Sequence, residues 1–289
     1  MNKTINGSNI PKLIIQTGKS KTELSHRQKK WISSWLATNP DYEYRFYDDQ
    51  DCLDMIEMEF PQYMEAYLAL PKPVEKADFF RYLAILRYGG FYADIDTTCK
   101  RPLDELVNSE DKIIIGIESI IFDPDKPNYS NIQYCQWTFG AEPNHPLLQD
   151  IVDQVAQNSL NHTVFSSSTH NNTLQKTGPM AFSRIVKNYI NEPGVRILTQ
   201  AHFGRLPFYF PPQTYPYDNP SFYSSNIFVI HHFEGSWMPI PFPQFNEVIK
   251  LILLLLFLFI IAFIWIKRKW KKNKEQQQQQ RRSLGDVYI

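Results

Sequence analysis

Short apolar runs alternate with longer segments of helical periodicity along the first half of the chain. Residues 10–18, "IPKLIIQTG", form an apolar run between turn-forming residues and predict a strand. Residues 25–40 repeat apolar side chains at helical spacing and predict a helix that stops at Asn39-Pro40. Residues 42–49 alternate like a strand that ends in acidic residues. Strands that alternate with helices predict an α/β domain with a mostly parallel central sheet.

The clearest helical pattern covers residues 73–90 and leads directly into a strand. Pro73 opens the helix and Gly89 ends it, and its apolar face is formed by Phe79, Tyr82, Leu83 and Leu86. The following residues, "FYADID", predict a strand that carries Asp94 and Asp96. Ligands of parallel sheets bind at the carboxyl ends of the strands. The pattern therefore places both aspartates at the binding edge of the sheet.

A long apolar segment near the C-terminus predicts a transmembrane helix. Residues 248–266, "VIKLILLLLFLFIIAFIWI", are apolar on every helix face, which is rare in the core helix of a soluble protein. As a helix the segment is roughly 28 Å long, enough to cross the hydrocarbon core of a bilayer. We expect a folded domain over residues 1–245, a transmembrane helix over 246–267, and a basic, Gln-rich, disordered tail over 268–289.

The charges beside this segment predict its orientation. The sequence "KRKWKKNK" follows the span and few basic residues precede it, which places the C-terminus in the cytosol and the domain in a lumen. Asn-x-Ser/Thr sites at Asn2, Asn6, Asn128, Asn161 and Asn171 favour the same orientation. The N-terminus lacks the apolar core of a signal peptide, which favours the alternative, a tail-anchored protein with a cytosolic domain. We expect the lumenal orientation.

The distribution of charge argues against nucleic acid as a partner. The chain has a formal net charge of +0, and many of its basic residues lie in the C-terminal tail. The rest of the chain is therefore mildly acidic, whereas a phosphate-binding surface needs its positive charge on the folded domain. We expect no nucleic-acid partner.

Asp94 and Asp96 form the pattern most indicative of chemistry. In an extended backbone, residues two apart point to the same side, so their carboxylates would lie together. The repulsion between them favours a divalent cation, and carboxylate oxygens suit Mg²⁺ or Mn²⁺. The simplest alternative is a solvated turn with two unrelated acids, because Asp-x-Asp is common.

Two other kinds of site, a calcium-binding loop and a phosphatase active site, also use aspartates at this spacing. A calcium-binding loop starting at Asp94 fails, because Cys99 stands where the loop needs glycine and Pro102 also occupies a loop position. The run "DIDTT" fits a haloacid dehalogenase-like phosphatase, with Asp94 as nucleophile and Asp96 as acid/base. Such enzymes usually carry the motif on their first strand, and no Gly-Asp-x-x-x-Asp follows in this chain.

The context of the pair resembles a known family. Residues 77–106, "ADFFRYLAILRYGGFYADIDTTCKRPLDEL", are similar to the signature of the family 32 glycosyltransferases. The runs "IPKLIIQT", "NPDYEYRFYDD" and "TGPMAF" resemble further blocks of that family. The resemblance implies a GT-A-like nucleotide-sugar-binding fold with a C-terminal transmembrane helix added. It also implies a nucleotide-sugar donor, a Mn²⁺ or Mg²⁺ ion, and retention of anomeric configuration.

The resemblance assigns roles to individual residues. It implies that Asp94 and Asp96 are the catalytic carboxylates, with Asp96 on the metal and Asp94 on the ribose or donor sugar. Asp78 would accept hydrogen bonds from sugar hydroxyls, and Arg81 would bind sugar or phosphate oxygens. The alternative for Arg81 is a structural ion pair with Asp78, three residues away on the same helix face. Tyr92 would contact the nucleotide, or else be a core tyrosine.

A second motif lies far along the chain. Residues 229–237, "VIHHFEGSW", resemble the family's closing motif, His-x-x-x-x-Ser-Trp. The resemblance implies a histidine on the metal, with Ser236 and Trp237 on the diphosphate. We select His232 as the metal ligand, because His231 can point into the sheet.

The acceptor and donor are less determined. Gly178 and Pro179 resemble a family block near the acceptor. The whole signature most resembles mannosyltransferases that modify inositol phosphoceramide, which implies GDP-mannose, a glycolipid or glycan acceptor, and a Golgi or ER membrane. UDP-sugar-dependent α-galactosyl and α-N-acetylglucosaminyl transferases share the signature and remain an alternative. A further alternative is an inactive, membrane-anchored sugar-binding protein.

Overall fold

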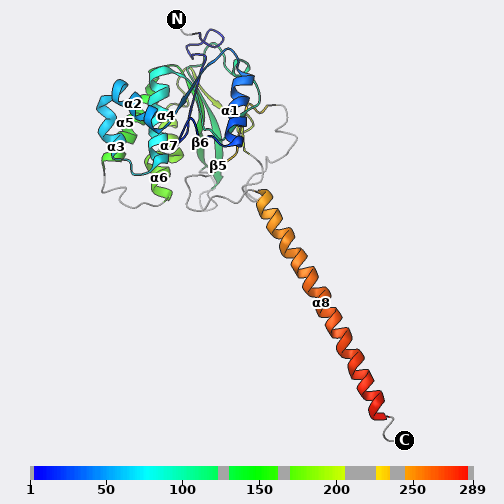
Figure 1. Ribbon diagram of the computed structural model, residues 1–289. Coiled ribbons are helices and arrows are strands. Elements are labelled where there is room, and N and C mark those ends of the chain that lie inside the picture. Colours follow the sequence, from blue (N-terminus) through cyan, green and yellow to red (C-terminus); the bar gives the residue numbers. More distant parts are fainter. Residues whose placement is uncertain (1–2, 123–129, 162–169, 206–225, 235–244, 286–289) are drawn as a thin grey trace. The chain divides into compact units, whose positions relative to one another are not determined.

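A computed structural model of the 289-residue chain describes residues 3–122, 130–161, 170–205, 226–234 and 245–285 (Figure 1). The chain divides into two units, Met1–Pro239 and Ile240–Ile289. The first unit holds two sheets and the helices α1 to α7, and the second contains the helix α8. Each unit is described separately below.

A six-stranded sheet lies at the centre of the first unit, in the order β2-β1-β3-β6-β5-β7. Its strands are β1 (Leu13–Thr17), β2 (Glu43–Tyr47), β3 (Gly90–Ala93), β5 (Ile113–Phe122), β6 (Ser130–Ala141) and β7 (Val195–Leu198). β1 is parallel to β2 and β3, and β5 is parallel to β7. β6 runs antiparallel to both of its neighbours, β3 and β5. The prediction of an α/β fold with a mostly parallel central sheet is confirmed.

A three-stranded sheet brings a late part of the chain beside the end of β3. It has the order β4-β9-β8, with strands β4 (Thr97–Cys99), β9 (Val229–His231) and β8 (Phe203–Arg205). β9 is antiparallel to β4, and in their register Thr97 lies opposite His231. Because β4 follows the Asp-x-Asp segment directly, this pairing carries residues 229–234 to the same place.

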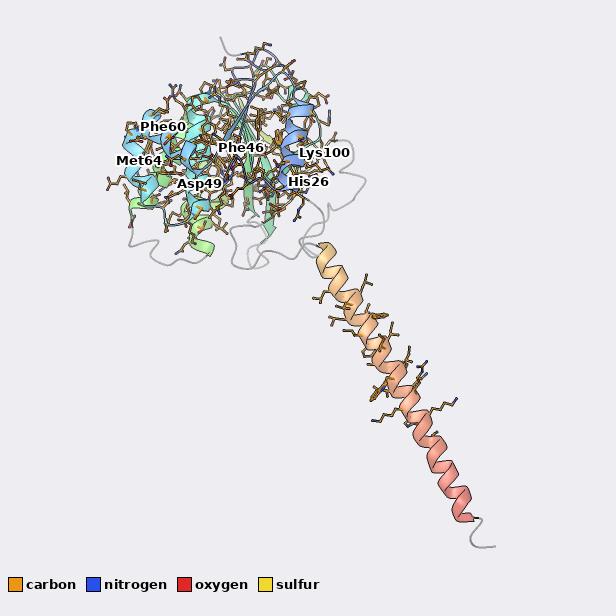
Figure 2. All side chains as sticks on the ribbon, in the orientation of Figure 1. His26, Phe46, Asp49, Phe60, Met64 and Lys100 are labelled. Carbon is orange, nitrogen blue, oxygen red and sulfur yellow. The ribbon has the colours of Figure 1, made fainter. Side chains whose placement is uncertain are left out.

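Helices and the small sheet cover the two faces of the large sheet. The helices are α1 (His26–Thr38), α2 (Asp49–Glu59), α3 (Met64–Leu68), α4 (Pro73–Tyr88), α5 (Pro146–Leu160), α6 (His170–Lys176) and α7 (Pro179–Val186). Leu13 and Ile15 of β1 pack with α4, α5 and α7, whereas Ile14 packs with Trp35 of α1 and with the small sheet. This alternation is the period of two expected of a strand buried on both faces. Side chains fill the space on both faces of the sheet (Figure 2).

The helix boundaries follow from local sequence. Ser25 and Gln28 form a capping box at the start of α1. Pro73 is the first residue of α4, where its missing N–H costs nothing, and Gly89 follows the last residue with φ of 65°. The predicted helix is therefore confirmed, and it ends where the glycine pair begins.

The second glycine is required by the close approach of β3 to β1. Gly90 has φ of 85°, a conformation that other residues rarely adopt. A Cβ atom on Gly90 would lie 2.5 Å from the backbone oxygen of Leu13 in β1. The pair Gly89-Gly90 thus turns the chain from α4 directly into the centre of the sheet.

The strand that follows is shorter than we predicted. β3 ends at Ala93, so Asp94 and Asp96 lie in the turn between β3 and β4 rather than in extended backbone. Hydrogen bonds close this turn on the backbone oxygen of Asp94, which accepts from Thr97 Oγ1 at 2.6 Å and from Gln16 Nε2 at 3.0 Å. The turn still lies at the carboxyl end of the strand, as predicted.

The second unit contains the helix α8 (Phe245–Gly285). Within it, Leu251–Lys271 is long and apolar enough to cross a membrane, by length and composition. We predicted the span over residues 246–267 and a disordered tail after it, whereas the helix continues to Gly285. The tail is rich in Lys, Arg and Gln and contains no proline before Gly285, so its residues favour a helix once one has begun.

Candidate active site

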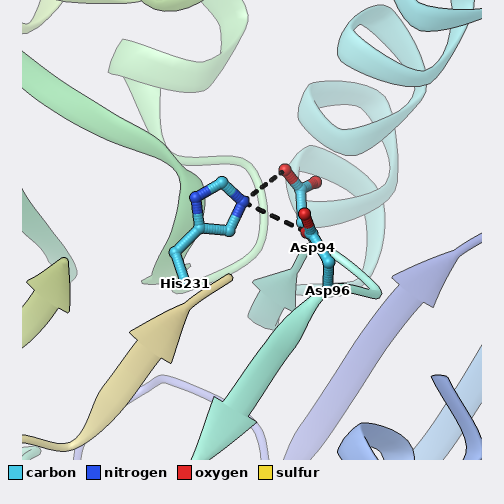
Figure 3. Close-up of side chains that lie close together, drawn as sticks. All are labelled: Asp94, Asp96 and His231. Atoms are coloured by element: carbon cyan, nitrogen blue, oxygen red, sulfur yellow. Dashed lines mark hydrogen bonds and ion pairs between the residues drawn. The ribbon is translucent and has the colours of Figure 1, made fainter. Parts of the chain in front are cut away.

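Two carboxylates and one imidazole converge at the carboxyl end of β3 (Figure 3). Ligand atoms of Asp94, Asp96 and His231 all lie within 4.8 Å of one another. His231 Nε2 is 3.1 Å from Asp96 Oδ1 and 3.9 Å from Asp94 Oδ2. The aspartates come from the turn after β3, and the histidine is the last residue of β9. The small sheet therefore assembles the cluster from segments that are distant in the sequence.

Each carboxylate is anchored by one oxygen and turns the other toward His231. Asp94 Oδ1 accepts a hydrogen bond from the Tyr92 hydroxyl at 2.8 Å and lies 3.3 Å from Arg81 Nη2. Asp96 Oδ2 accepts from the backbone N–H of Glu234 at 2.8 Å. The remaining oxygens, Asp94 Oδ2 and Asp96 Oδ1, are the ones that face His231 Nε2. The protein thus fixes both carboxylates and keeps one oxygen of each toward the centre of the cluster.

The charges in the cluster are strongly coupled. Burial opposes ionisation of Asp96, but His231 and the Glu234 N–H outweigh it and lower the pKa of Asp96 to about 2. Burial also opposes a charge on His231, yet the nearby carboxylates of Asp96 and Asp94 raise the pKa of this histidine. Burial raises the pKa of Asp94, and the Arg81 guanidinium partly offsets this. The contact of 3.1 Å between His231 Nε2 and Asp96 Oδ1 therefore joins two groups whose pKa shifts favour opposite charges.

The cluster fits a divalent cation. Carboxylate oxygens suit both Mg²⁺ and Mn²⁺, and an imidazole nitrogen beside them favours the transition metal. Asp94 keeps 25% of its side chain exposed, against 13% for Asp96 and 9% for His231. Asp94 is thus the member of the cluster most accessible to a molecule arriving from solvent. The ligand atoms of the three residues lie within 4.8 Å of one another, and they could hold a Mn²⁺ ion once His231 has lost its proton.

The structure places His231, rather than the His232 that we selected, beside the two carboxylates. His232 lies apart from the carboxylates: its ring stacks on Trp31 of α1, with centroids 4.6 Å apart, and its Nε2 is 2.7 Å from Thr98 Oγ1. The physical reason is the register of β9, which places His231 opposite Thr97 and turns the next residue away. The sequence held a signal for this, because in the motif His-x-x-x-x-Ser-Trp the spacing to Ser236 fits His231.

Asp78 and Arg81 form a buried link behind the cluster. Arg81 Nη2 lies 2.9 Å from Asp78 Oδ1 and 3.3 Å from Asp94 Oδ1. The structural ion pair that we weighed is therefore present, and the same guanidinium also reaches Asp94. Burial raises the pKa of Asp78 to about 6, with Arg81 and the Thr177 hydroxyl acting against the shift.

Asp78 is not placed to bind a donor sugar in this geometry. Its side chain is only 3% exposed. Its Oδ1 accepts from Gln136 Nε2 at 3.1 Å and its Oδ2 accepts from Thr177 Oγ1 at 2.8 Å. Both carboxylate oxygens are thus engaged inside the protein, and Asp78 acts on the site through Arg81.

Tyr92 is a core tyrosine, as one of our two interpretations held, and its hydroxyl reaches the cluster. Its side chain is 1% exposed and belongs to the core between the sheet and α4. Its hydroxyl lies at the edge of the site, 2.8 Å from Asp94 Oδ1 and 3.0 Å from Thr17 Oγ1. The Arg81 guanidinium lies 4.8 Å from the centre of its ring. Tyr92 therefore holds Asp94 in place from within the core.

The remaining predicted residues fall into two groups. Gly178 precedes α7 and Pro179 is its first residue, directly after Thr177, which binds Asp78. Ser236 and Trp237 lie outside the described residues.

Sequence reasoning missed Gln136 and Thr177. Thr177 begins the run "TGPMAF", which was a usable signal, whereas nothing local marks Gln136 on β6.

Known proteins resemble the chain across this site. Residues 25–113 match a sequence model of the family described as "Glycosyltransferase sugar-binding region containing DXD motif". The chain is 32% identical over 209 residues to the initiation-specific alpha-1,6-mannosyltransferase of Candida albicans, covering 63% of this chain and 54% of that protein. It is 29% identical over 200 residues to a mannosyl phosphorylinositol ceramide synthase of Saccharomyces cerevisiae, covering 67% of this chain and 47% of that protein.

A solved structure, the PaToxG glycosyltransferase, aligns with a TM-score of 0.44 and 18% identity, over 65% of this chain and 71% of that one. The chain spans about half the length of the curated relatives named above, 54% and 47%. The matched region contains α4, the glycine pair and the Asp-x-Asp turn. Residues 25–113 are therefore similar to a glycosyltransferase sugar-binding region of the DXD type, and the resemblance found in the sequence is confirmed.

Proposed function

We propose that the chain is a metal-dependent, retaining glycosyltransferase that moves mannose from GDP-mannose onto a glycolipid or glycan acceptor. The observation that carries the proposal is the convergence of Asp94, Asp96 and His231, with one oxygen of each carboxylate turned toward the imidazole. The DXD family match supports the sugar-transfer class. The relatives named as mannosyltransferases and as a mannosyl phosphorylinositol ceramide synthase support mannose and a lipid or glycan acceptor.

Asp94, Asp96 and His231 would hold the Mn²⁺ or Mg²⁺ ion. When bound, such an ion neutralises the negative charge that develops on a nucleoside diphosphate as it leaves the sugar. Around it, this chain's own residues keep the carboxylates in position: Arg81 and Tyr92 fix Asp94, and the N–H of Glu234 fixes Asp96.

The other roles follow from exposure and position. Asp94 is the most exposed carboxylate of the cluster, so we assign it the contact with the ribose or sugar of the donor. Arg81 and Asp78 are buried and act as the charged support behind it. We assign Ser236 and Trp237 to the contact with the diphosphate of the donor, as the family resemblance implies. The acceptor would lie near Gly178 and Pro179, because Thr177 connects their loop to Asp78.

A donor panel tests the proposal. The full chain in detergent would be incubated with GDP-mannose, UDP-galactose or UDP-N-acetylglucosamine, each with Mn²⁺ or with EDTA, and the released nucleotide measured. We expect Mn²⁺-dependent release of GDP from GDP-mannose. Release of UDP alone would move the assignment to the UDP-sugar enzymes. Release of no nucleotide would contradict enzymatic activity and favour an inactive sugar-binding protein.

We further propose that the chain is anchored in a Golgi or ER membrane by α8, with its domain in the lumen. The apolar stretch Leu251–Lys271 and the basic residues after it support this orientation. Two Asn-x-Ser/Thr sites make the proposal testable. Asn161 is exposed at the end of α5, whereas Asn6 Nδ2 donates to the backbone oxygens of Asp104, at 2.6 Å, and Val107, at 2.8 Å.

In a eukaryotic host, we expect endoglycosidase to shift the gel mobility of the full chain. Asn161→Gln should reduce the shift, because Asn161 is exposed to solvent at the end of α5. Asn6→Gln should leave the shift unchanged, because a glycan on Asn6 would replace a hydrogen that its amide uses to bind the backbone. A chain with no shift, whose domain is degraded by protease added to intact microsomes, would contradict the lumenal orientation.

A further inference from the structure

One aromatic residue contacts both halves of the carboxylate and histidine cluster. Trp137 lies on β6, and its backbone oxygen accepts a hydrogen bond from the backbone N–H of Asp94 at 2.8 Å. Its indole stacks on the imidazole of His231, with centroids 4.7 Å apart and an interplanar angle of 8°. Trp137 therefore joins the turn after β3 in the large sheet to the last residue of β9 in the small sheet.

The second ring nitrogen of His231 lacks the usual support. A histidine that binds a metal normally donates its other N–H to an acceptor, which fixes the orientation of the ring. His231 Nδ1 is buried and has no hydrogen-bond partner among the described residues. The ring is instead enclosed by aromatic side chains. Trp137 stacks on its face, and the Phe233 ring lies edge-on to it, with centroids 3.9 Å apart and an interplanar angle of 71°. Packing therefore takes the place of a hydrogen bond at Nδ1, whereas Nε2 contacts Asp96 at 3.1 Å.

Trp137 is itself held by packing. Its Nε1 is buried without a hydrogen-bond partner among the described residues, and its side chain is 4% exposed. Phe203 of β8 packs against the indole, with centroids 6.0 Å apart and an angle of 56°. Phe203, Trp137 and His231 thus form one aromatic row that ends at the carboxylates. Leaving the Nε1–H of a buried indole without a partner is costly. The stack on His231 best explains why Trp137 occupies this position.

We propose that Trp137 is a positioning residue for the metal site: its indole face fixes the His231 imidazole by stacking, in place of a hydrogen bond to Nδ1. This inference rests on the proposed function, because it assumes that His231 binds the metal. The inference concerns only the side chain of Trp137. The backbone contact to Asp94 remains in any substitution of Trp137, so a substitution changes the support of the histidine and leaves the anchor of the aspartate.

The test uses the full chain in detergent and Mn²⁺ alone, with free Mn²⁺ followed by electron paramagnetic resonance. Trp137→Leu removes the flat face, and we expect the Kd for Mn²⁺ to rise by about 10-fold, as loss of an outer-shell partner typically does. Trp137→Phe keeps a smaller flat ring and should recover part of the affinity.

Trp31 supplies a matched control. It is also buried, at 7% exposed against 4% for Trp137, and it stacks on the neighbouring histidine, His232, at 4.6 Å. Trp31→Leu should leave the Kd for Mn²⁺ unchanged, because His232 does not face the carboxylates. Thermal unfolding of each variant shows whether the two substitutions disturb the fold to a similar degree.

The outcomes separate this inference from the proposed function. A wild-type chain that binds no Mn²⁺ would refute the metal site itself. A wild-type chain that binds Mn²⁺, with Trp137→Leu and Trp137→Phe binding equally well, would refute only the positioning role. Equal losses in the Trp137→Leu and Trp31→Leu variants would also refute it, because the effect would then be general destabilisation. Should Trp137→Leu fail to fold, the Trp137→Phe variant alone decides between unchanged and weakened affinity.

Discussion

Two regions build the site in different ways. The first, from α4 to the turn after β3, is a polar network in which Asp78, Arg81 and Asp94 are joined by ion pairs and hydrogen bonds. The second, from β9 to Glu234, is held by backbone pairing with β4 and by the stack of His231 on Trp137. Asp94 is thus positioned by ion pairs and hydrogen bonds, and His231 by strand register, by aromatic packing and by its contact with Asp96.

The difference predicts how each region responds to substitution. Removing one member of a buried charge network leaves the others without their partner, which is costly. Removing one aromatic face from a stack costs less, because stacking adds only about 0.5–1.5 kcal/mol to the burial of the rings. The acids should therefore be the sensitive part of the site and the aromatic supports the tunable part.

The largest effect is expected at Asp96. Asp96→Ala removes a carboxylate oxygen that faces His231, and we expect turnover of the donor to fall by more than about 100-fold. The matched control is Glu105→Ala, which removes an exposed carboxylate paired with Arg101 at 2.6 Å. Donor turnover and thermal unfolding would be measured for both variants. Wild-type turnover in the Asp96→Ala variant would contradict the assignment of Asp96 to the active site.

A second test uses pH to examine the charge network. The pKa of Asp78 is raised by burial from 3.8 to about 6, so between these values the folded chain binds more protons than the unfolded chain. The free energy of unfolding should therefore fall as pH rises from about 4 to about 7, by about 3 kcal/mol from this group. In Asp78→Asn this part of the pH dependence should disappear.

Urea unfolding of the full chain in detergent, followed by tryptophan fluorescence across this pH range, measures the effect. Acidic groups away from this network contribute equally to both proteins, so the difference between the two curves reports on Asp78 and the groups coupled to it. Identical slopes for wild type and Asp78→Asn would show that Asp78 is not a strained buried acid. The network behind Asp94 would then need another explanation.

A smaller effect is expected at Tyr92. Tyr92→Phe keeps the core ring and removes the hydroxyl that binds Asp94 at 2.8 Å, and we expect a loss of about 1 kcal/mol in the free energy of unfolding. Donor turnover should fall as well, because Asp94 loses one of its anchors. Tyr63→Phe is the control, since it removes a hydrogen bond to Asp153 at 2.5 Å outside the site. Equal turnover in the two variants would argue that Arg81 alone positions Asp94.

The region from α4 to the turn after β3 was predictable from the sequence, whereas the contacts of His231 and Trp137 were not. Helical spacing placed Asp78 and Arg81 on one face, and the glycine pair placed Asp94 after the end of a strand. Even the separate motifs proved to be joined, because Lys12 of "IPK" lies 2.6 Å from Asp104 of "PLD". These relations are local or follow from the order of strands in a parallel sheet.

His231 and Trp137 depend on contacts between distant segments. The choice between His231 and His232 is set by the register of β9 against β4. No hydrophobic period encodes that register, so only the spacing of the closing motif pointed to His231. Trp137 lies on the antiparallel strand β6, and its place beside Asp94 follows from the pairing of β3 with β6. The end of β3 was also misplaced, because the hydrogen bond from Gln16 to the Asp94 oxygen comes from a neighbouring strand.

The most direct test compares the two neighbouring histidines in Mn²⁺ binding by the full chain. Our account predicts that His231→Ala raises the Kd for Mn²⁺ by at least about 10-fold, because the imidazole beside both carboxylates is lost. His232→Ala should leave the Kd unchanged, because its ring lies against Trp31 and Thr98. A loss of Mn²⁺ affinity in His232→Ala, with His231→Ala binding like the wild type, would contradict the site described above.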